Sequence, residues 1–360
     1  MSNSDKLREE LGNEFESYQI IKIKTNESIG SLYYGNFYKN RFYFVEYALS
    51  KASGICAIGL NGEVLWRYNK FGKGPGEFIE CTFSRLLPFS DQLVIYDLVQ
   101  GKLLFLGLDG KFIRELKIDL WLNDLCELND HNLLLNIQKS EARHRRPDGQ
   151  RFDLCIISEN GQINKSFMFH SHTLLRWANS GSNLIPMDST FFYKNTLDYN
   201  IYEINSSGLF PKWTLDFKSY NADTSKLLYA TENSDTFINK MLQGDVETVF
   251  FFDVIHAKSS IWIFNNFKGS NILSIFDKQT SEIRQFKSDS TNFFRVHGIP
   301  FLGIFQSKNS IVTTIDAIDA YEDWQRRSPE EKQKTDPCWQ SLMNTINPLD
   351  NPIIFAGYLK

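Results

Sequence analysis

The chain has few of the features that would place it outside ordinary globular proteins. Only ten of its 360 residues are proline, which excludes Pro-rich linkers, and 23% of the residues are charged. No run of about 18 or more apolar residues occurs, so the sequence predicts no membrane-spanning helix. A signal peptide is not visible either. The polar start is compatible with a cytosolic beginning, and equally with a chain in which Met1 replaces a lipidated cysteine.

Cysteine and positive charge are also scarce. The five cysteines form no C-x-x-C pair, which leaves a zinc ribbon or a thioredoxin-like site without support, so buried thiols are expected. The formal net charge is −4 and no basic stripe is present, which argues against nucleic acid as the partner. The densest basic run, residues 143–151, surrounds a Pro-Asp-Gly turn signal and indicates a solvated hairpin tip.

Aromatic residues, in contrast, are abundant. Phe, Trp and Tyr make up 14% of the chain, with 30 Phe and 15 Tyr, and such residues favour half-buried strands. A sequence pattern repeats along the chain: an apolar strand, a short turn and another strand. Its turn glycines are Gly62, Gly110, Gly161 and Gly208, spaced by 48, 51 and 47 residues. Asn-Gly and Asp-Gly predict type I′ hairpin turns, and the period is typical of four-stranded propeller blades.

Other segments complete the predicted blades. Near-continuous apolar runs predict second strands that are buried on both faces, at residues 41–47, 92–97, 132–136, 260–264 and 310–314. Two strands of the last blade are expected at 294–298 and 311–313, and a third at the C-terminus, 351–360. Residues 18–24 can supply its fourth strand, which removes an exposed edge.

The sequence therefore predicts an all-β fold, a six-bladed β-propeller whose last blade is closed by N- and C-terminal strands. Residues 1–16 are expected to form a tail and 17–360 a single domain. Helix-like spacing of apolar residues predicts short helical insertions at about 221–243 and 317–350.

One stretch carries a family resemblance. Residues 71–78 read Phe-Gly-Lys-Gly-Pro-Gly-Glu-Phe, and Ile95-Tyr96-Asp97 and Asp109-Gly110-Lys111-Phe112 follow. This stretch resembles an NHL-type repeat. More closely, the chain resembles the six-bladed propeller lipoproteins of Bacteroides-type bacteria, most of which have no assigned activity. The resemblance covers nearly the whole chain, but only residues 71–113 and the C-terminal strand are specific.

The resemblance implies a fold and an exported lipoprotein, in the periplasm or anchored to the outer membrane. It implies no reaction. The glycines at 72–76 form neither a Walker nor a Rossmann pattern, so they are interpreted as a tight connection between blades. Asp97 is interpreted as the acceptor of an Asx-type turn. His170 and His172 alternate on one side of the chain and could share a metal, but no third ligand can be named.

Polar residues on the predicted innermost strands are the candidate binding residues. Innermost strands line the central channel of a propeller, so convergent side chains from several blades would build a pocket. The alternative is that they only hydrogen-bond within a water-filled channel. The candidates are Arg85, Asp124, Asp188, Asp253, His256, Arg295 and His297.

Three functions stay open at this point. The first is an exported binding or scaffold propeller for a glycan, peptide or protein, acting through the channel mouth or one face. The second is a metal-assisted hydrolase, lactonase or lyase in the central channel, for which calcium or another divalent ion is conceivable without a supporting motif. The third is a structural subunit of a surface complex, docked through residues 317–350. No Ser nucleophile elbow, HExxH or kinase signature occurs, so the sequence does not decide whether the protein is an enzyme.

Overall fold

The computed structural model describes residues 11–48, 51–118, 120–128, 130–137, 151–170, 184–187, 190–194, 199–205, 208–221, 249, 252–268, 270–288, 294–301, 305–307 and 310–360. The chain divides into two compact units. The first holds Met1–Phe71, Ala257–Ile261 and Leu273–Lys360, and the second holds Gly72–His256 and Trp262–Ile272.

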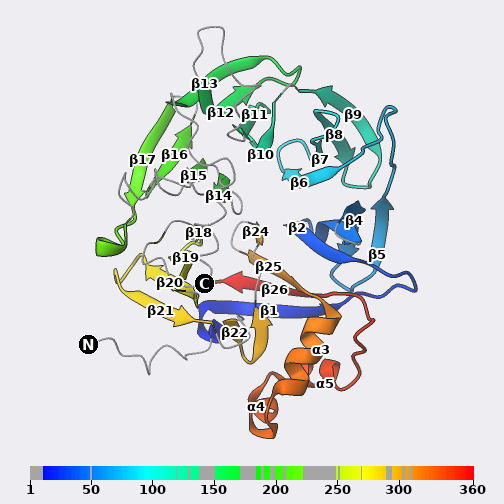
Figure 1. Ribbon diagram of the computed structural model, residues 1–360, viewed down its shortest axis with the longest axis vertical. Helices are drawn as coiled ribbons and strands as arrows, with labels where there is room; N and C mark the ends of the chain where they lie inside the picture. Colours follow the sequence, from blue (N-terminus) through cyan, green and yellow to red (C-terminus); the bar gives the residue numbers. More distant parts are fainter. Residues whose placement is uncertain are drawn as a thin grey trace. The chain divides into compact units, whose positions relative to one another are not determined.

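The protein is all-β, with six four-stranded antiparallel sheets and few helices. This strand content and sheet order are those of a six-bladed β-propeller, so the predicted fold class is confirmed. Aromatic and β-branched residues fill the second and third strands of the blades, where residues such as Phe42, Phe44 and Val94 are fully buried. In Figure 1 the four strands of β6–β9 lie side by side in the cyan and teal part of the chain.

The second unit contains three complete blades. Their strands are β6 (Cys81–Leu87), β7 (Gln92–Asp97), β8 (Lys102–Gly107), β9 (Phe112–Lys117), β10 (Leu122–Glu127), β11 (Leu133–Ile137), β12 (Arg151–Ile157), β13 (Ile163–His170), β14 (Leu184–Met187), β15 (Thr190–Lys194), β16 (Asn200–Asn205) and β17 (Gly208–Thr214). The first strands of consecutive blades lie against one another, β10 against both β6 and β14. Side chains on these strands therefore meet those of the next blade.

The first unit contains one blade of consecutive strands and the closing blade. The strands are β2 (Ser31–Tyr38), β3 (Arg41–Ala48), β4 (Lys51–Gly59) and β5 (Val64–Tyr68), then β1 (Phe15–Lys22), β26 (Ile353–Leu359), β25 (Ser310–Ile315) and β24 (Phe305–Ser307). The N-terminal β1 pairs antiparallel with the C-terminal β26. The predicted closure by one strand from each end is confirmed.

The remaining four-stranded sheet is β18 (Phe252–His256), β19 (Ser260–Phe267), β20 (Ser270–Asp277) and β21 (Ile283–Lys287). Two short 3-10 helices, η2 (Leu11–Glu14) and η3 (Lys218–Tyr220), complete the described elements outside the insertion between β25 and β26. The predicted helical insertion at 221–243 lies outside the described residues, apart from Asn221 at its start.

Three helices interrupt the closing blade between β25 and β26. They are α3 (Ala317–Arg326), α4 (Pro329–Lys334) and α5 (Pro337–Met343), drawn in orange to red in Figure 1. Ser328 and Glu331 form a capping box at the start of α4, and Asp336 caps α5. Trp324 of α3 and Trp339 of α5 are buried, and the two helices contact each other, so an apolar core helps to hold the insertion.

The strand predicted at 294–298 for the last blade is wrong, because the strand ends at Val296 and does not belong to that blade. Phe294–Val296 (β22) pairs instead with Ile299–Phe301 (β23) as a separate hairpin, and β24 is the first strand of the closing sheet. His297 has a φ of 49° and Gly298 a φ of 77°. Two consecutive positive φ values are what a two-residue hairpin turn requires, so His-Gly turns the chain where a continuous strand was predicted.

The turn type of the repeats also differs from the prediction. Gly62, Gly110 and Gly161 have positive φ, at 84°, 80° and 85°, whereas Asn61 and the fourth predicted turn glycine, Gly208, do not. The Gly59 amide donates to the Glu63 carbonyl at 2.9 Å, and the register of β4 and β5 shifts beside it. This is a three-residue loop with a bulge in place of a type I′ turn. Glycine is still required, because an L side chain is strained at this φ.

Among the residues described, no helix combines the length and the apolar character needed to cross a bilayer.

Candidate functional site

Three first strands carry a β-bulge. The register shifts between Tyr33 and Asn36 in β2, between Cys81 and Phe83 in β6, and at Asn123 in β10. Bulges bend a strand and re-aim its side chains, and they occur often beside functional sites. The first strands also hold most of the candidate residues from the sequence, so the site is built from them.

Arg85 of β6 and Asp124 of β10 form an ion pair within the second unit. The Arg85 Nε donates to the Asp124 Oδ1 at 2.5 Å. The Asp124 side chain is fully buried and that of Arg85 is 18% exposed. Asp124 also accepts the Leu125 amide at 2.8 Å and, at 3.4 Å, the amide of Leu184 at the start of β14. One buried carboxylate therefore links the first strands of three consecutive blades.

Two asparagines extend this polar cluster. The Asn123 side-chain amide, at the bulge, donates to the Asn136 Oδ1 at 3.1 Å. Asn136 lies directly opposite Asp124 in the register of β10 and β11 and is 2% exposed. Its Nδ2 atom has no hydrogen-bond partner within the part of the chain that the structure describes. A buried donor without a partner is costly, so an ordered water molecule is expected beside this amide.

Asn136 belongs to a recurring position that sequence reasoning missed. In four consecutive blades a polar residue closes the apolar run of the second strand, and each is at least 97% buried: Glu46, Asp97, Asn136 and Lys194. In the first two blades this residue accepts a hydrogen bond from the loop that precedes the blade. The Gly30 amide donates to Glu46, and the Ile79 amide donates to Asp97. The signal was present as a polar residue at the end of each apolar run.

Lys194 is the cationic member of this set. It ends β15, its side chain is 1% exposed, and its Nζ lies 3.5 Å from the Asp253 Oδ1 at the start of β18. Burial lowers the pKa of Lys194, although the Asp253 carboxylate acts in the opposite direction. Asp253, a candidate from the sequence, is 51% exposed. Its side chain is the most solvent-exposed of the charged candidates that the structure describes.

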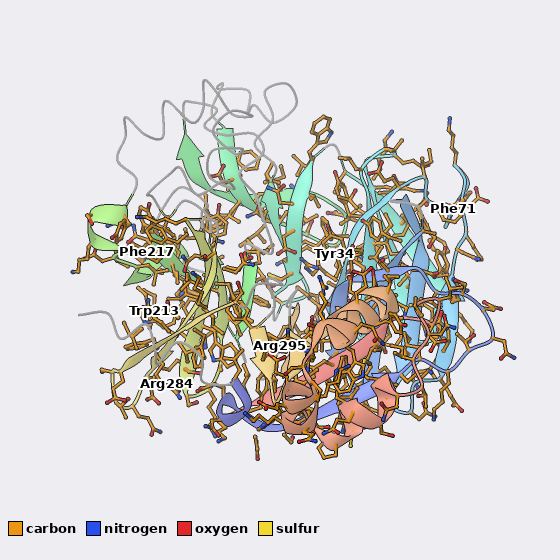
Figure 2. All side chains as sticks on the ribbon, turned by 60° about the horizontal axis from the view of Figure 1, so that its bottom comes forward. Tyr34, Phe71, Trp213, Phe217, Arg284 and Arg295 are labelled. Carbon is orange, nitrogen blue, oxygen red and sulfur yellow. The ribbon has the colours of Figure 1, made fainter. Side chains whose placement is uncertain are left out.

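His256 lies on a first strand, β18, but its ring is buried between aromatic residues. It stacks on Phe192 at a centroid distance of 5.6 Å and on Trp213, labelled in Figure 2, at 5.2 Å. The residue is 6% exposed. These contacts are those of a packing residue of the second unit.

Arg295 and Asp323 pair in the first unit, where Arg295 belongs to the β22–β23 hairpin and not to the first strand of a blade. The Arg295 Nη2 donates to the Asp323 Oδ1 at 2.7 Å and its Nη1 to the Oδ2 at 3.0 Å. Arg327 donates to the same buried carboxylate at 2.6 Å. Figure 2 shows Arg295 beside α3. These bonds fasten the β22–β23 hairpin to the helical insertion.

His297 forms the turn of that hairpin. Its carbonyl accepts the Asp336 amide at 2.9 Å, and its ring packs on Tyr18 at 5.6 Å. Gly12 lies so close that a Cβ there would be 2.3 Å from the imidazole. The residue therefore joins the N-terminal segment to the insertion.

Other sequence candidates lie outside the described residues. They are Asp188, the side chains of His170 and His172, and the basic residues 143–146. No geometry can be assigned to them.

The Gly-rich loop at 72–76 is a tight turn that is bonded to its own residues and to strand β9. The Gly74 amide donates to the Glu77 carboxylate at 2.8 Å, and the Gly76 amide donates to Glu115 at 3.2 Å. Asp97 accepts the Ile79 amide at 2.8 Å and the Gln100 amide at 3.1 Å. Because carboxylates already occupy these amides, the loop cannot hold a phosphate in this conformation. It connects two blades, as interpreted from its sequence.

A Ser-His-Glu group at the turn after β6 lacks the geometry of a catalytic triad. The Ser90 hydroxyl and the His131 Nδ1 both contact the carboxylate of Glu127, and the hydroxyl lies 3.4 Å from the same ring nitrogen. A general base needs one nitrogen for the nucleophile and the other for the orienting carboxylate. Glu127 also accepts the Phe89 amide at 2.7 Å, so the group fastens a turn.

The buried cysteines cannot act as thiolates near neutral pH. Burial raises the pKa of Cys56 and of Cys155 to about 12. Within the described ranges, no three His, Cys, Asp or Glu side chains are grouped so that they could hold a metal ion. The cluster around Arg85 and Asp124 has balanced charge and amide groups. Such a site is suited to hydrogen-bond an uncharged or zwitterionic polar ligand.

Comparisons with solved structures show a likeness in fold to proteins of two Bacteroides species. A presumed exported protein of Bacteroides fragilis NCTC 9343 matches 98% of this chain and 97% of its own, with 15% identity and a TM-score of 0.79. A member of the family DUF4221 from Bacteroides vulgatus matches 96% of each chain, with 12% identity and a TM-score of 0.56. These likenesses concern the fold alone. No curated protein matches the sequence.

The family model described as "Domain of unknown function (DUF4934)" matches residues 5–357. Because the match spans nearly the whole chain, the protein belongs to this family.

Proposed function

We propose that the protein is an exported binding propeller that holds its ligand on the first strands β6 and β10, around Arg85 and Asp124. The observation that carries the proposal is the polar cluster at the bulge of β10. Arg85, Asp124 and Asn123 are brought together from two blades, and the Asn136 amide beside them has no described partner. Convergent polar groups of this kind fix the orientation of a ligand in most binding sites.

Export and anchoring belong to the same proposal. The likeness in fold to a presumed exported protein of Bacteroides fragilis supports a place outside the cytoplasm. The resemblance of residues 71–78 to NHL-like propeller lipoproteins supports a lipid anchor on the precursor and a periplasmic or outer-membrane site. Fractionation of cells that express the natural precursor, with labelled palmitate, tests both. Label in the envelope fraction supports them, and an unlabelled cytosolic product contradicts them.

Thermal melting of the purified protein tests the binding function. The protein would be heated with neutral glycans, peptides, calcium or zinc, with EDTA as a separate arm. A ligand at about 100 times its Kd stabilises the folded state by about 2.7 kcal/mol. Stabilisation by a glycan or peptide supports a binding module. Stabilisation by a metal that EDTA reverses would favour the hydrolase or lyase alternative.

Two variants place the ligand. Asn123→Ala removes one side-chain amide of the cluster, and Arg85→Lys replaces the guanidinium by an ammonium group. Both variants keep a cation at position 85 to pair with Asp124. Each is expected to weaken binding about tenfold, or about 1.4 kcal/mol, because an amide or the guanidinium fork is lost. Arg114→Lys, on the outer strand β9 of the same unit, is the matched control. If all three variants bind the ligand with the affinity of the wild type, this site is excluded.

A further inference from the structure

Three of the hairpins that join the third and fourth strands of a blade turn in the same way. In each turn the glycine has a positive φ, at 84° for Gly62, 80° for Gly110 and 85° for Gly161. The residue before the glycine uses its side-chain Oδ1 to accept the backbone amide of the residue after it, at 3.1 to 3.2 Å. The residues that supply this oxygen are Asn61, Asp109 and Asn160. Because the backbone bonds are alike, the three turns differ mainly in their side chains.

Ser158 distinguishes the turn between β12 and β13 from the other two. It occupies the position at which the other turns have Gly59 and Gly107. A Cβ at these two glycines would lie 2.9 Å and 2.7 Å from the Oδ1 atom two residues further on. In the third turn the Ser158 hydroxyl donates to the Asn160 Oδ1, and its second contact, with the Gln162 carbonyl, is longer at 3.3 Å. Of the three turns, this one alone brings a hydroxyl to the side-chain oxygen.

An asparagine that is followed by a glycine can modify itself. The glycine amide nitrogen attacks the asparagine Cγ, and the absence of a Cβ on glycine leaves this approach open. Water carries the amide proton to Nδ2, the Cγ–Nδ2 bond breaks, and Nδ2 leaves as ammonia. A water molecule then opens the succinimide ring and gives aspartate or isoaspartate. The reaction consumes water, releases ammonia and requires no other reactant.

The two Asn-Gly turns differ in how well they stabilise this reaction. Negative charge develops on the asparagine Oδ1 during the attack, and donors already aimed at that oxygen stabilise the transition state. Asn160 has two such donors, the Ser158 hydroxyl and the Gln162 amide at 3.2 Å. At Asn61 the Glu63 amide, at 3.1 Å, is the one donor that the described residues supply. The attack is therefore expected to be faster at Asn160.

The packing of the glycine favours the same site. Gly62 is buried, its carbonyl accepts the Lys24 amide at 2.8 Å, and a Cβ there would lie 2.1 Å from the Lys22 carbonyl. Gly161 is half-buried, and an added Cβ there would meet the Leu116 side chain at 3.1 Å. Cyclisation moves the backbone at the glycine. Bonded backbone resists this movement at Gly62, whereas a flexible leucine side chain opposes it less at Gly161.

We propose that Asn160 is a self-modification site, at which the Ser158 hydroxyl promotes deamidation to aspartate and isoaspartate. The site is separate from the Arg85 cluster. The product places a new negative charge next to Glu159, whose carbonyl accepts the Arg114 Nη1 of β9 at 3.1 Å. The modified turn thus lies where two consecutive blades of the second unit meet. Because the loss of ammonia is irreversible, the modification accumulates with the age of each molecule.

Incubation of the purified protein at neutral pH, followed by proteolysis and mass spectrometry, tests the proposal. The rates of conversion of Asn160 and Asn61 are each divided by the rate in a synthetic unstructured peptide of the same local sequence. This division removes the effect of the neighbouring residue types. The corrected rate is expected to be at least about tenfold higher at Asn160 than at Asn61, because of its second donor and its looser glycine.

Variants of Ser158 test the part played by the hydroxyl. Ser158→Ala is expected to slow the conversion of Asn160 at least about threefold, less than the loss of such a donor costs in a buried active site, because Asn160 is exposed. Ser158→Thr keeps a hydroxyl and should retain the wild-type rate. Asn61 is the internal control, and its rate should be the same in all three proteins.

Melting curves show whether each variant is folded, and Ser158→Gly, the residue of the other two turns, replaces Ser158→Ala if the latter does not fold. Equal corrected rates at Asn160 and Asn61 overturn the proposal. It is also overturned if Asn160 converts as fast in Ser158→Ala as in the wild type, or as slowly in Ser158→Thr as in Ser158→Ala. An Asn160 that stays intact while its reference peptide converts fully has the same consequence.

Discussion

Glu14 ends the short helix η2, and its carboxylate is largely buried against Arg284 of β21. Burial raises the pKa of Glu14, while Arg284 and the C-terminal Lys360 lower it and Asp277 raises it further. The folded protein therefore holds a proton on Glu14 more tightly than the unfolded chain does. By linkage, the contribution of this group to stability is greatest below the ordinary pKa of glutamate, about 4.3, and declines as the pH rises through the raised value.

The variant Glu14→Gln should remove this pH dependence. We expect the free energy of unfolding of the wild type, relative to that of Glu14→Gln, to fall between pH 4 and pH 7. Urea unfolding at several pH values measures it. Glu282→Gln, an exposed carboxylate in the same unit, controls for the loss of one charge. A difference that increases with pH would mean that the ion pair with Arg284 outweighs the cost of burial.

Single residues also show how far sequence reasoning reached into the site. Arg85 and Asp124 were named from their strands, and the structure brings them together at 2.5 Å; their part in binding stays a prediction. Asn123, Asn136 and Lys194 were missed. The polar residue at the end of each apolar run marked the positions of Asn136 and Lys194, but their burial there, and the bulge of β10 at Asn123, depend on contacts that no local spacing of residue types encodes.

At the scale of elements, one buried carboxylate is a main attachment of the helical insertion to the first unit, beside the bond from the Asp336 amide to the His297 carbonyl. Asp323 of α3 is 1% exposed and receives bonds from Arg295 and Arg327, and Arg327 also reaches the hydroxyl of Thr335. Gly298 allows this approach, because a Cβ there would lie 2.6 Å from that hydroxyl. The insertion is therefore a packed part of the first unit.

The variant Asp323→Asn is expected to destabilise the protein by about 3 to 5 kcal/mol, because it leaves two arginines without their buried counter-charge. Thermal unfolding gives the magnitude. Hydrogen exchange should show faster exchange in α3 and α5 than elsewhere in the first unit. Asp319→Asn, at an exposed position of the same helix, is the control. Unchanged exchange in the insertion would show that its apolar core holds it without the ion pairs.

At the scale of the whole molecule, the closing blade depends on chain ends that are far apart in sequence. β1 covers β26 over most of its length, and Ile21 joins a buried cluster with Leu32, Phe44 and Ile354. Phe15 packs on Gly357, where a Cβ would lie 2.3 Å from its ring. Glycine is required at 357 because the ring occupies that space.

Removal of residues 1–22 is expected to lower the melting temperature and to promote association, because it exposes the edge of β26 and the apolar residues beneath β1. Differential scanning calorimetry and size-exclusion chromatography measure the two effects. Removal of residues 1–10 alone keeps β1 intact and is the control. If both truncations melt and elute alike, the blade does not need β1 for its stability.

The sequence by itself determined the number of blades, the closure by both ends and the insertion before β26. These follow from local patterns, since turn glycines recur at the period of a blade and apolar runs mark strands buried on both faces. The tertiary structure alone decided the turn type at Asn61-Gly62, the hairpin at His297 and the partners of the polar residues. Each of these depends on backbone dihedral angles and on contacts between blades, which residues distant in sequence impose on one another.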